Sequence, residues 1–101
     1  MTLEEQFHED VMATVKACRA LRYNPTYFLQ MVEAHGAVNA AKTLVGSGDF
    51  QSGLITLWEK GRLDLSMENR ILNPKFTDLF TEDERAAAQK RLADLSYAPV
   101  W

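Results

Sequence analysis

Apolar residues recur at intervals of three and four near the start of the chain, which is the spacing of one helical face. The repeat consists of Leu3, Phe7, Val11, Val15 and Cys18. Thr2 and Glu5 match a capping box, in which each side chain satisfies a backbone N–H of the first turn. Acidic residues come first and basic residues last, as the helix dipole favours. The pattern predicts a helix over residues 3–22.

Proline and glycine divide the next part of the chain into two further helices. Pro25 cannot donate a backbone hydrogen bond but suits the first position of a helix, so a second helix is predicted over 25–35. Asn24 is its expected N-cap, and Gly36 is expected to end it in the left-handed conformation. A third helix is predicted over 37–45.

Four large apolar residues follow the glycine-rich segment 46–53 within about two helical turns. They are Leu54, Ile55, Leu57 and Trp58. This density predicts a fourth helix over 52–60 that is apolar around most of its circumference and lies at the centre of the fold. Asp49 or Ser52 is the expected cap, and Gly61 is expected to end the helix.

Two more helices are predicted in the last third of the chain. Ser66 is a candidate cap for a short helix over 67–72, which stops at Asn73-Pro74. Thr81 and Glu84 match a second capping box and begin a helix over 82–96, followed by a tail over 97–101. No alternating strand pattern of useful length is present. The chain is therefore expected to form one all-α domain over 1–101, a compact orthogonal bundle of five to six short helices.

Composition places this domain in a reducing compartment. Its 101 residues can bury a core without a disulfide, and Cys18 is the one cysteine in the sequence. The acidic start does not match a signal peptide, and no apolar run approaches the roughly 18 residues of a membrane span. We expect a cytoplasmic protein. The net charge of -3 argues against broad, sequence-independent binding to nucleic acid.

Three stretches resemble a small helical domain family of bacterial proteins without an assigned activity. They are YNPTYFLQMVEAHGAVNAAKTLV, GLITLWEKGRLDLSMENRIL and LFTEDERAAAQKRL, within residues 22–97. Members of this family stand alone or are appended to larger proteins, some nuclease- or defence-like. The resemblance implies a helical fold and a bacterial or phage origin, and it supplies no catalytic residue. A second glycine is expected where this chain has Ala37.

The glycine-rich segment could cradle phosphate, because glycine N–H groups at a helix start can point at an anion. The residues available are Gly46, Ser47, Gly48, Ser52 and Gly53. A Walker sequence requires Lys and Ser or Thr after the last glycine, and a dinucleotide site requires a preceding strand. Neither is present, so a turn between helices is the favoured interpretation and no cofactor is expected.

Catalytic and metal-binding patterns are weak. His8 and His35 are far apart and no H-x-x-x-H or C-x-x-C spacing occurs, so no metal site is expected. Asp64 and Glu68 could share a cleft near Arg62, but carboxylates near a helix start are ordinary capping residues. No catalytic residue is assigned, and a small enzyme with an unrecognised site remains one alternative.

Aromatic residues point to a protein interface, because Trp, Tyr and Arg anchor such surfaces. The favoured function is a non-enzymatic interaction or regulatory module that docks on another protein or self-associates through an aromatic patch. Its expected residues are Tyr27, Arg62 and Trp101. A second alternative is a nucleic-acid-associated protein with a basic patch. That patch would contain Lys60, Arg62, Arg70 and Lys75.

Overall fold

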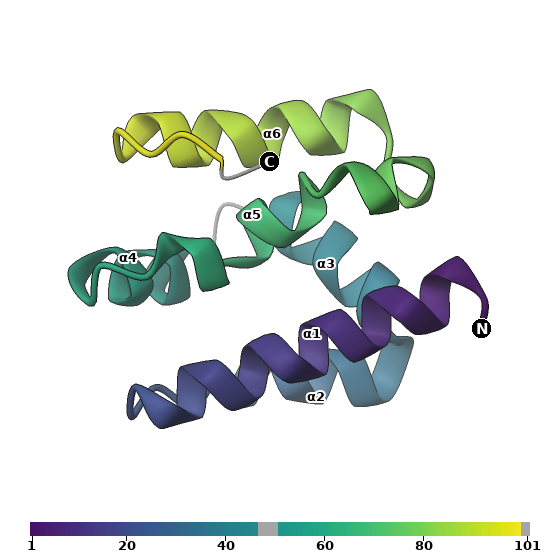
Figure 1. The fold of residues 1–101 in the computed structure, drawn as a ribbon, viewed down its shortest axis with the longest axis horizontal. Helices are drawn as coiled ribbons and strands as arrows, with labels where there is room; N and C mark the ends of the chain where they lie inside the picture. Colours follow the sequence, from purple (N-terminus) through teal and green to yellow (C-terminus); the bar gives the residue numbers. More distant parts are fainter. Residues whose placement is uncertain (47–50, 100–101) are drawn as a thin grey trace.

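The computed structural model describes residues 1–46 and 51–99, which form α-helices and short 3-10 helices (Figure 1). In chain order the elements are α1 Leu3–Ala20, α2 Thr26–His35, α3 Ala37–Gly46, α4 Gln51–Glu59, η2 Leu63–Leu65, α5 Met67–Ile71, η3 Pro74–Leu79 and α6 Glu82–Asp94. These residues contain no strand, and the predicted all-α class is confirmed. The predicted Asp49 cap lies outside the described residues, and Ser52 lies inside α4 rather than before it.

Helix α3 occupies the centre of the bundle. It contacts α1, α2, α5 and α6, and Figure 1 shows it crossing between the α1–α2 layer and the α5–α6 layer. Its buried positions are Ala37, Ala40, Ala41, Leu44 and Val45. Three alanines allow neighbouring backbones to approach closely, which suits a helix surrounded by others.

The prediction that the fourth helix is central is wrong. Helix α4 packs mainly on η2 at the edge of the molecule. Leu54 and Leu57 are buried, but Ile55 is 37% exposed and Trp58 is 49% exposed. Leu54 and Leu57 form one stripe along the helix. Ile55 and Trp58, each one position later, form a second stripe about 100° further around the helix. One stripe faces the core and the other faces solvent.

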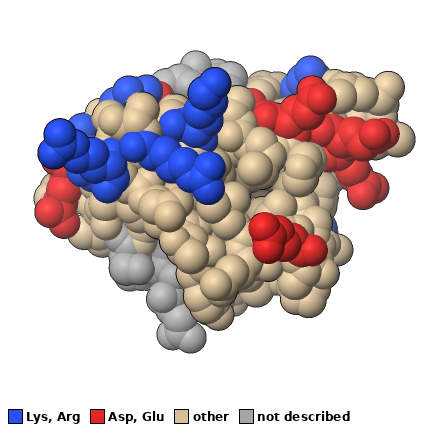
Figure 2. Space-filling view, turned by 90° about the horizontal axis from the view of Figure 1, so that it is seen from below, with Lys and Arg blue, Asp and Glu red and all other residues tan. Residues whose placement is uncertain are grey.

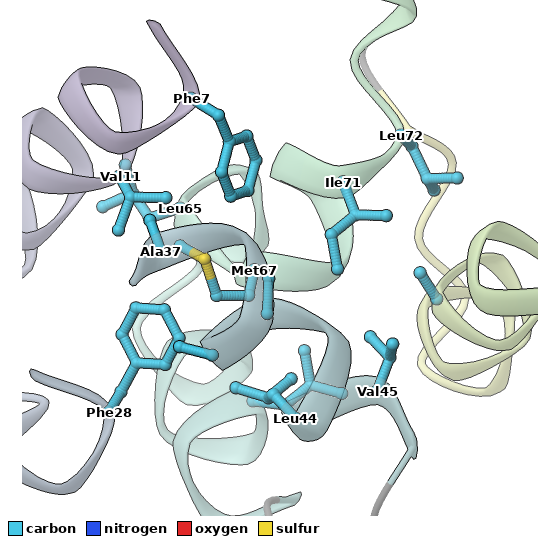
Figure 3. Packing of buried hydrophobic residues seen from close by; sticks show 14 of the residues in the cluster. Phe7, Val11, Phe28, Ala37, Leu44, Val45, Leu65, Met67, Ile71 and Leu72 are labelled. Carbon is cyan, nitrogen blue, oxygen red and sulfur yellow. The ribbon is translucent and has the colours of Figure 1, made fainter. Parts of the chain in front are cut away.

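The predicted stripe on α1 faces the core, as expected. Phe7 meets the rings of Phe76 and Phe80 edge to face, with ring centroids 5.1 and 5.2 Å away. Figure 3 shows Phe7 and Val11 of α1 directed toward the side chains of Met67 and Ile71 in the interior. One hydrophobic core therefore joins α1 to α5 and to the segment around η3.

The predicted caps are confirmed at three helix starts. Backbone N–H groups of Glu5 and Glu84 donate to the hydroxyls of Thr2 and Thr81, both at 3.1 Å, and both capping boxes are complete. The hydroxyl of Ser66 accepts from the N–H of Asn69 at 3.2 Å.

The Asn24 cap is wrong. Helix α2 begins at Thr26 without a side-chain cap. The amide oxygen of Asn24 instead accepts a hydrogen bond from Nε of Arg19 at 3.3 Å. Gly36 ends α2 with a φ of 85°, which favours glycine, although its ψ of 161° is not that of the left-handed helix.

Helices α1, α4 and α6 end in the same way, with a Schellman motif. The residue in the left-handed conformation is Arg22, Gly61 or Ser96, with φ of 63°, 69° and 58° respectively. The next N–H donates to the carbonyl five residues earlier, in the pairs Tyr23–Cys18, Arg62–Leu57 and Tyr97–Leu92. Residues 22 and 96 were expected to be helical, but they form these turns. Each motif fixes the direction of the side chain that follows the helix.

Candidate functional site

An apolar groove lies between α4 and the C-terminal end of α6. It has a volume of about 250 Å³, and its lining residues are Trp58, Gly61, Leu63, Leu95, Ser96 and Tyr97. A smaller hollow of about 80 Å³ also includes Leu95 and extends the apolar surface to Ile55. We call the larger hollow the α4–α6 groove. Exposed Trp58 is its largest side chain and borders open solvent.

An ion pair lies close to one edge of the groove. Arg62 donates to both carboxylate oxygens of Asp64, from Nε at 3.0 Å and from Nη2 at 3.1 Å. These hydrogen bonds lower the pKa of Asp64. Burial raises the pKa of Tyr97, and the negative charge of Asp64 raises it further. The Arg62–Asp64 pair therefore acts on a side chain that lines the α4–α6 groove.

Basic side chains gather at the end of the molecule where α1 ends. Figure 2 shows Lys and Arg gathered over that end, with acidic side chains at the edge of the group, and further acidic residues toward the opposite end, where α1 begins. We call the basic group the cationic end. Its members come from two places that the contacts between α1 and η2 bring together. Lys16, Arg19 and Arg22 belong to the end of α1 and the turn after it, and Lys60 and Arg62 belong to the turn between α4 and η2. Arg62 belongs to it because its charge lowers the pKa of Cys18 on α1, against the larger effect of burial, which raises it.

A small cavity of about 60 Å³ lies inside the bundle, next to the carboxylate of Glu68 and the thiol of Cys18. Burial raises the pKa of Glu68, of Cys18 and of Tyr23. Shifted pKa values in a cavity are a feature of catalytic sites. The volume holds a few water molecules rather than a substrate, since a water molecule takes about 30 Å³ in the liquid. Glu68 is also bound to Arg91 at 3.2 Å.

Tyr23 separates this cavity from a surface hollow of about 230 Å³, and its ring lines both. Its hydroxyl lies so close to Gly53 that a Cβ at position 53 would be 2.5 Å away. The absence of a side chain at Gly53 therefore makes room for Tyr23.

The three predicted interface residues occupy different places. Arg62 lies at the C-terminal end of α4, near the α4–α6 groove. Tyr27 is 62% exposed in the first turn of α2 and lines the 230 Å³ hollow instead. Trp101 lies outside the described residues, as do Ser47 and Gly48 of the glycine-rich segment. The prediction that Tyr27, Arg62 and Trp101 form one surface stays a prediction.

The predicted nucleic-acid residues do not form one patch. Lys60 and Arg62 belong to the cationic end, but Arg70 binds Asp10 on α1 through two hydrogen bonds, one of them 2.8 Å long from Nε. Lys75 lies 5.8 Å from the ring centroid of Phe76. Asp10 belongs to the half of α1 that carries the acidic residues, and Phe76 packs on Phe7 in that same half. The basic residues grouped with Lys60 and Arg62 are instead Lys16, Arg19 and Arg22. From the sequence, the helix dipole alone explained these charges.

Asp64 and Glu68 do not share a cleft. Asp64 is partly exposed and paired with Arg62, whereas Glu68 is buried and paired with Arg91. The cause is their position on either side of the α5 start: Asp64 lies in η2 before the Ser66 cap, and Glu68 faces inward from the first turn.

Sequence reasoning counted Trp58 and Tyr97 among the aromatic residues typical of interfaces but did not select them, and it missed the half-buried Leu95 altogether. The signal that could have revealed Trp58 is its three-residue spacing from Ile55, which forms a stripe separate from Leu54 and Leu57. No comparable local signal marks Leu95 and Tyr97, because their place beside α4 depends on the tertiary fold.

Within residues 1–46 and 51–99, no group of three or more His, Cys, Asp or Glu side chains could hold a metal ion. In the same residues, no helix has both the length and the apolar character needed to cross a membrane. Comparisons of the chain with protein-family models, with curated proteins and with solved structures found no match.

Proposed function

We propose that the protein is a non-enzymatic interaction module that docks a segment of another protein in the α4–α6 groove. The observation that carries this proposal is the exposure of Trp58, nearly half of whose surface is open beside a 250 Å³ apolar groove. Grouped exposed apolar side chains mark interaction surfaces on soluble proteins, and Trp is the residue type most enriched among interface hot spots.

Docking would be driven by burial of the apolar surface of Trp58, Leu95 and Tyr97. Apolar burial contributes about 25 cal/mol per Å² of area removed from water. Loss of a Trp at the centre of such a contact typically costs about 2 kcal/mol or more of binding free energy. Arg62 supplies a polar rim next to the groove, with its guanidinium already oriented by Asp64.

The test is affinity capture from bacterial lysate with the unmodified chain, Trp58→Ala and Tyr27→Ala, each with and without nuclease. We expect a partner that survives nuclease treatment, is retained by Tyr27→Ala and is lost with Trp58→Ala. Tyr27→Ala is the matched control, since it removes an exposed aromatic ring elsewhere on the surface. Equal recovery with all three proteins would remove the α4–α6 groove as the docking site.

The Trp101 prediction is tested in the same assay. Under this proposal, Trp101→Ala or deletion of residues 98–101 weakens association and leaves the circular dichroism spectrum unchanged. A deletion that unfolds the domain would show that the tail belongs to the core, and it would remove Trp101 as an interface residue.

Nucleic-acid association is a second candidate, favoured by the five residues of the cationic end (Figure 2). Its mechanism would be neutralisation of phosphates by Lys and Arg, with release of counterions. It predicts binding to DNA or RNA that weakens steeply with salt and is lost with Arg62→Glu. Binding that does not respond to salt would exclude it. A small enzyme is a third candidate, and its carboxylate would be Glu68 beside the 60 Å³ cavity.

A further inference from the structure

The α4–α6 groove is bordered by two cations at the end of α4. Gly61 lines the groove, and Lys60 and Arg62 stand on either side of Gly61 in the chain. The N–H of Arg62 donates to the carbonyl of Leu57 at 2.9 Å, which fixes this turn against α4. A segment bound in the groove therefore lies next to positive charge.

The positive surface continues from Arg62 to the end of α1. Arg62 and its partner Asp64 are both near enough to Cys18 for their charges to shift the pKa of the thiol, in opposite directions, and Arg19 and Arg22 follow Cys18 along the chain. Figure 2 shows the basic side chains at this end as one group. The α4–α6 groove and the cationic end thus meet at Arg62.

Arg22 has a backbone conformation that glycine would adopt at a lower cost in free energy. Its φ is 63°, and Gly61 occupies the corresponding position of the Schellman motif that ends α4 with a φ of 69°. The left-handed conformation is unfavourable for a residue with a Cβ. Strained residues of this kind are concentrated at functional sites. Ser96 takes the same conformation at the end of α6, so what the motif contributes here is a fixed backbone for Arg22 at the end of α1.

Most of the cationic end has no internal counter-ion. Among the described residues, the ion pairs are Lys42–Glu84, Arg62–Asp64, Arg70–Asp10 and Arg91–Glu68. Four cations of the cationic end are in none of them. These are Lys16, Arg19, Arg22 and Lys60. These four side chains therefore make no ion pair within the described residues, in a chain whose net charge is -3.

Two features favour a protein segment over a nucleic acid on this surface. Asp64 neutralises Arg62 at 3.0 Å, so the positive charge of the cationic end does not continue to Tyr97 as the unbroken basic stripe that a phosphate backbone would follow. The groove itself is lined by Trp58 and Leu95, which need apolar side chains as partners. Acidic side chains next to apolar anchors meet both requirements, because potentials across an interface are complementary.

We infer that the partner segment is amphipathic and acidic, with apolar anchors in the α4–α6 groove and Asp or Glu residues over the cationic end. This inference rests on the proposed function, since it names the class of segment that the same groove binds. The apolar anchors supply most of the affinity, and the acidic flank sets the orientation and the rate of association.

The test is selection of a phage-displayed library of random peptides on the intact chain, with a counter-selection on Trp58→Ala. We expect the Trp58-dependent peptides to contain about twice as many acidic residues as the unselected library, beside two or more apolar anchors. A synthetic peptide of the enriched sequence should bind roughly tenfold more weakly to Arg19→Gln/Arg22→Gln/Lys60→Gln. Lys75→Gln is the matched control and should bind normally.

The outcomes separate this inference from the proposed function. Trp58-dependent peptides without an acidic excess would overturn the inference and leave the groove as a docking site. No Trp58-dependent peptide at all would overturn both. A labelled single-stranded DNA that binds through Arg19, Arg22 and Lys60 without needing Trp58 would assign the cationic end to nucleic acid and overturn the acidic segment.

Discussion

Nη1 of Arg91 donates to Oε2 of Glu68 at 3.2 Å and to the carbonyl oxygen of Leu44 at 2.9 Å. The side chains of Arg91 and Glu68 are only 13% and 3% exposed, so this is the most buried ion pair among the described residues. Its partners lie on α6, α5 and α3. A single guanidinium therefore ties three helices together around one buried carboxylate.

Removal of the Glu68 carboxylate should destabilise the fold strongly. Glu68→Ala leaves the buried charge of Arg91 without its counter-ion, which typically costs about 3–5 kcal/mol. Urea denaturation followed by circular dichroism measures the free energy of unfolding. Asp64→Ala removes the exposed Arg62–Asp64 pair and should cost about 1 kcal/mol or less. Similar losses in the two variants would contradict the structural role of the buried pair.

Glu68 should also make stability depend on pH. Burial raises the pKa of Glu68 in the folded protein above its ordinary value of 4.5. Its contribution to stability is then fully present below pH 4.5 and is lost as the pH rises through the raised pKa. The stability of the unmodified chain relative to Glu68→Gln, which cannot titrate, should therefore fall over that window. Urea titrations of both proteins at several pH values measure this difference. A rise of this relative stability with pH would mean that the charge of Arg91 lowers the pKa of Glu68 by more than burial raises it.

The three Schellman motifs predict opposite effects of glycine and alanine. Arg22→Gly should stabilise the protein by about 0.5–1 kcal/mol, because it relieves the left-handed strain at a small cost in unfolded-chain entropy. Ser96→Gly should act in the same direction. Gly61→Ala should destabilise by about 1 kcal/mol, because it introduces the strain. Thermal unfolding of the three variants tests the signs. If Arg22→Gly is destabilised, the arginine side chain stabilises the fold by more than its left-handed backbone conformation destabilises it.

Gly53 and Tyr23 should show strong coupling. Gly53→Ala places a Cβ 2.5 Å from the Tyr23 hydroxyl, so the ring must move, at a typical cost of about 1–3 kcal/mol. In a Tyr23→Phe background the hydroxyl is gone, and the same alanine should be neutral or stabilising by up to about 1 kcal/mol through helix propensity. A double-mutant cycle of unfolding free energies measures the coupling. Additive effects would show that the two residues do not touch.

The helices were predictable because their determinants are local. The capping boxes at Thr2 and Thr81 act within one turn, and the structure confirms them. Gly36 ends α2 as predicted, although not in the left-handed helical conformation. The place of α4 was not predictable in this way. Its four large apolar residues suggested a central helix, whereas the alanines of α3 are what allow a helix to have neighbours on every side.

Of the candidate site, the sequence predicted only a residue that could be recognised by its own chemistry. Arg62 was named from sequence, and it lies where the groove and the cationic end meet. The ion pairs of Arg70 and Arg91 join residues 60 and 23 positions apart, so no sequence window contains both partners. Leu95 and Tyr97 become part of the groove only when α6 returns beside α4.

The central position of α3 also determines how the molecule opens. Helix α4 can open locally more easily than α3, because it rests mainly on η2 and is held to the core by Leu54 and Leu57 alone among its large apolar residues. Helix α3 has no such freedom, since α1, α2, α5 and α6 all pack on it and Arg91 binds its Leu44 carbonyl. Its backbone amides become accessible to solvent only when the whole bundle comes apart. The hydrogen exchange of α3 therefore reports the global stability of the protein, and that of α4 reports local fluctuation beside the α4–α6 groove.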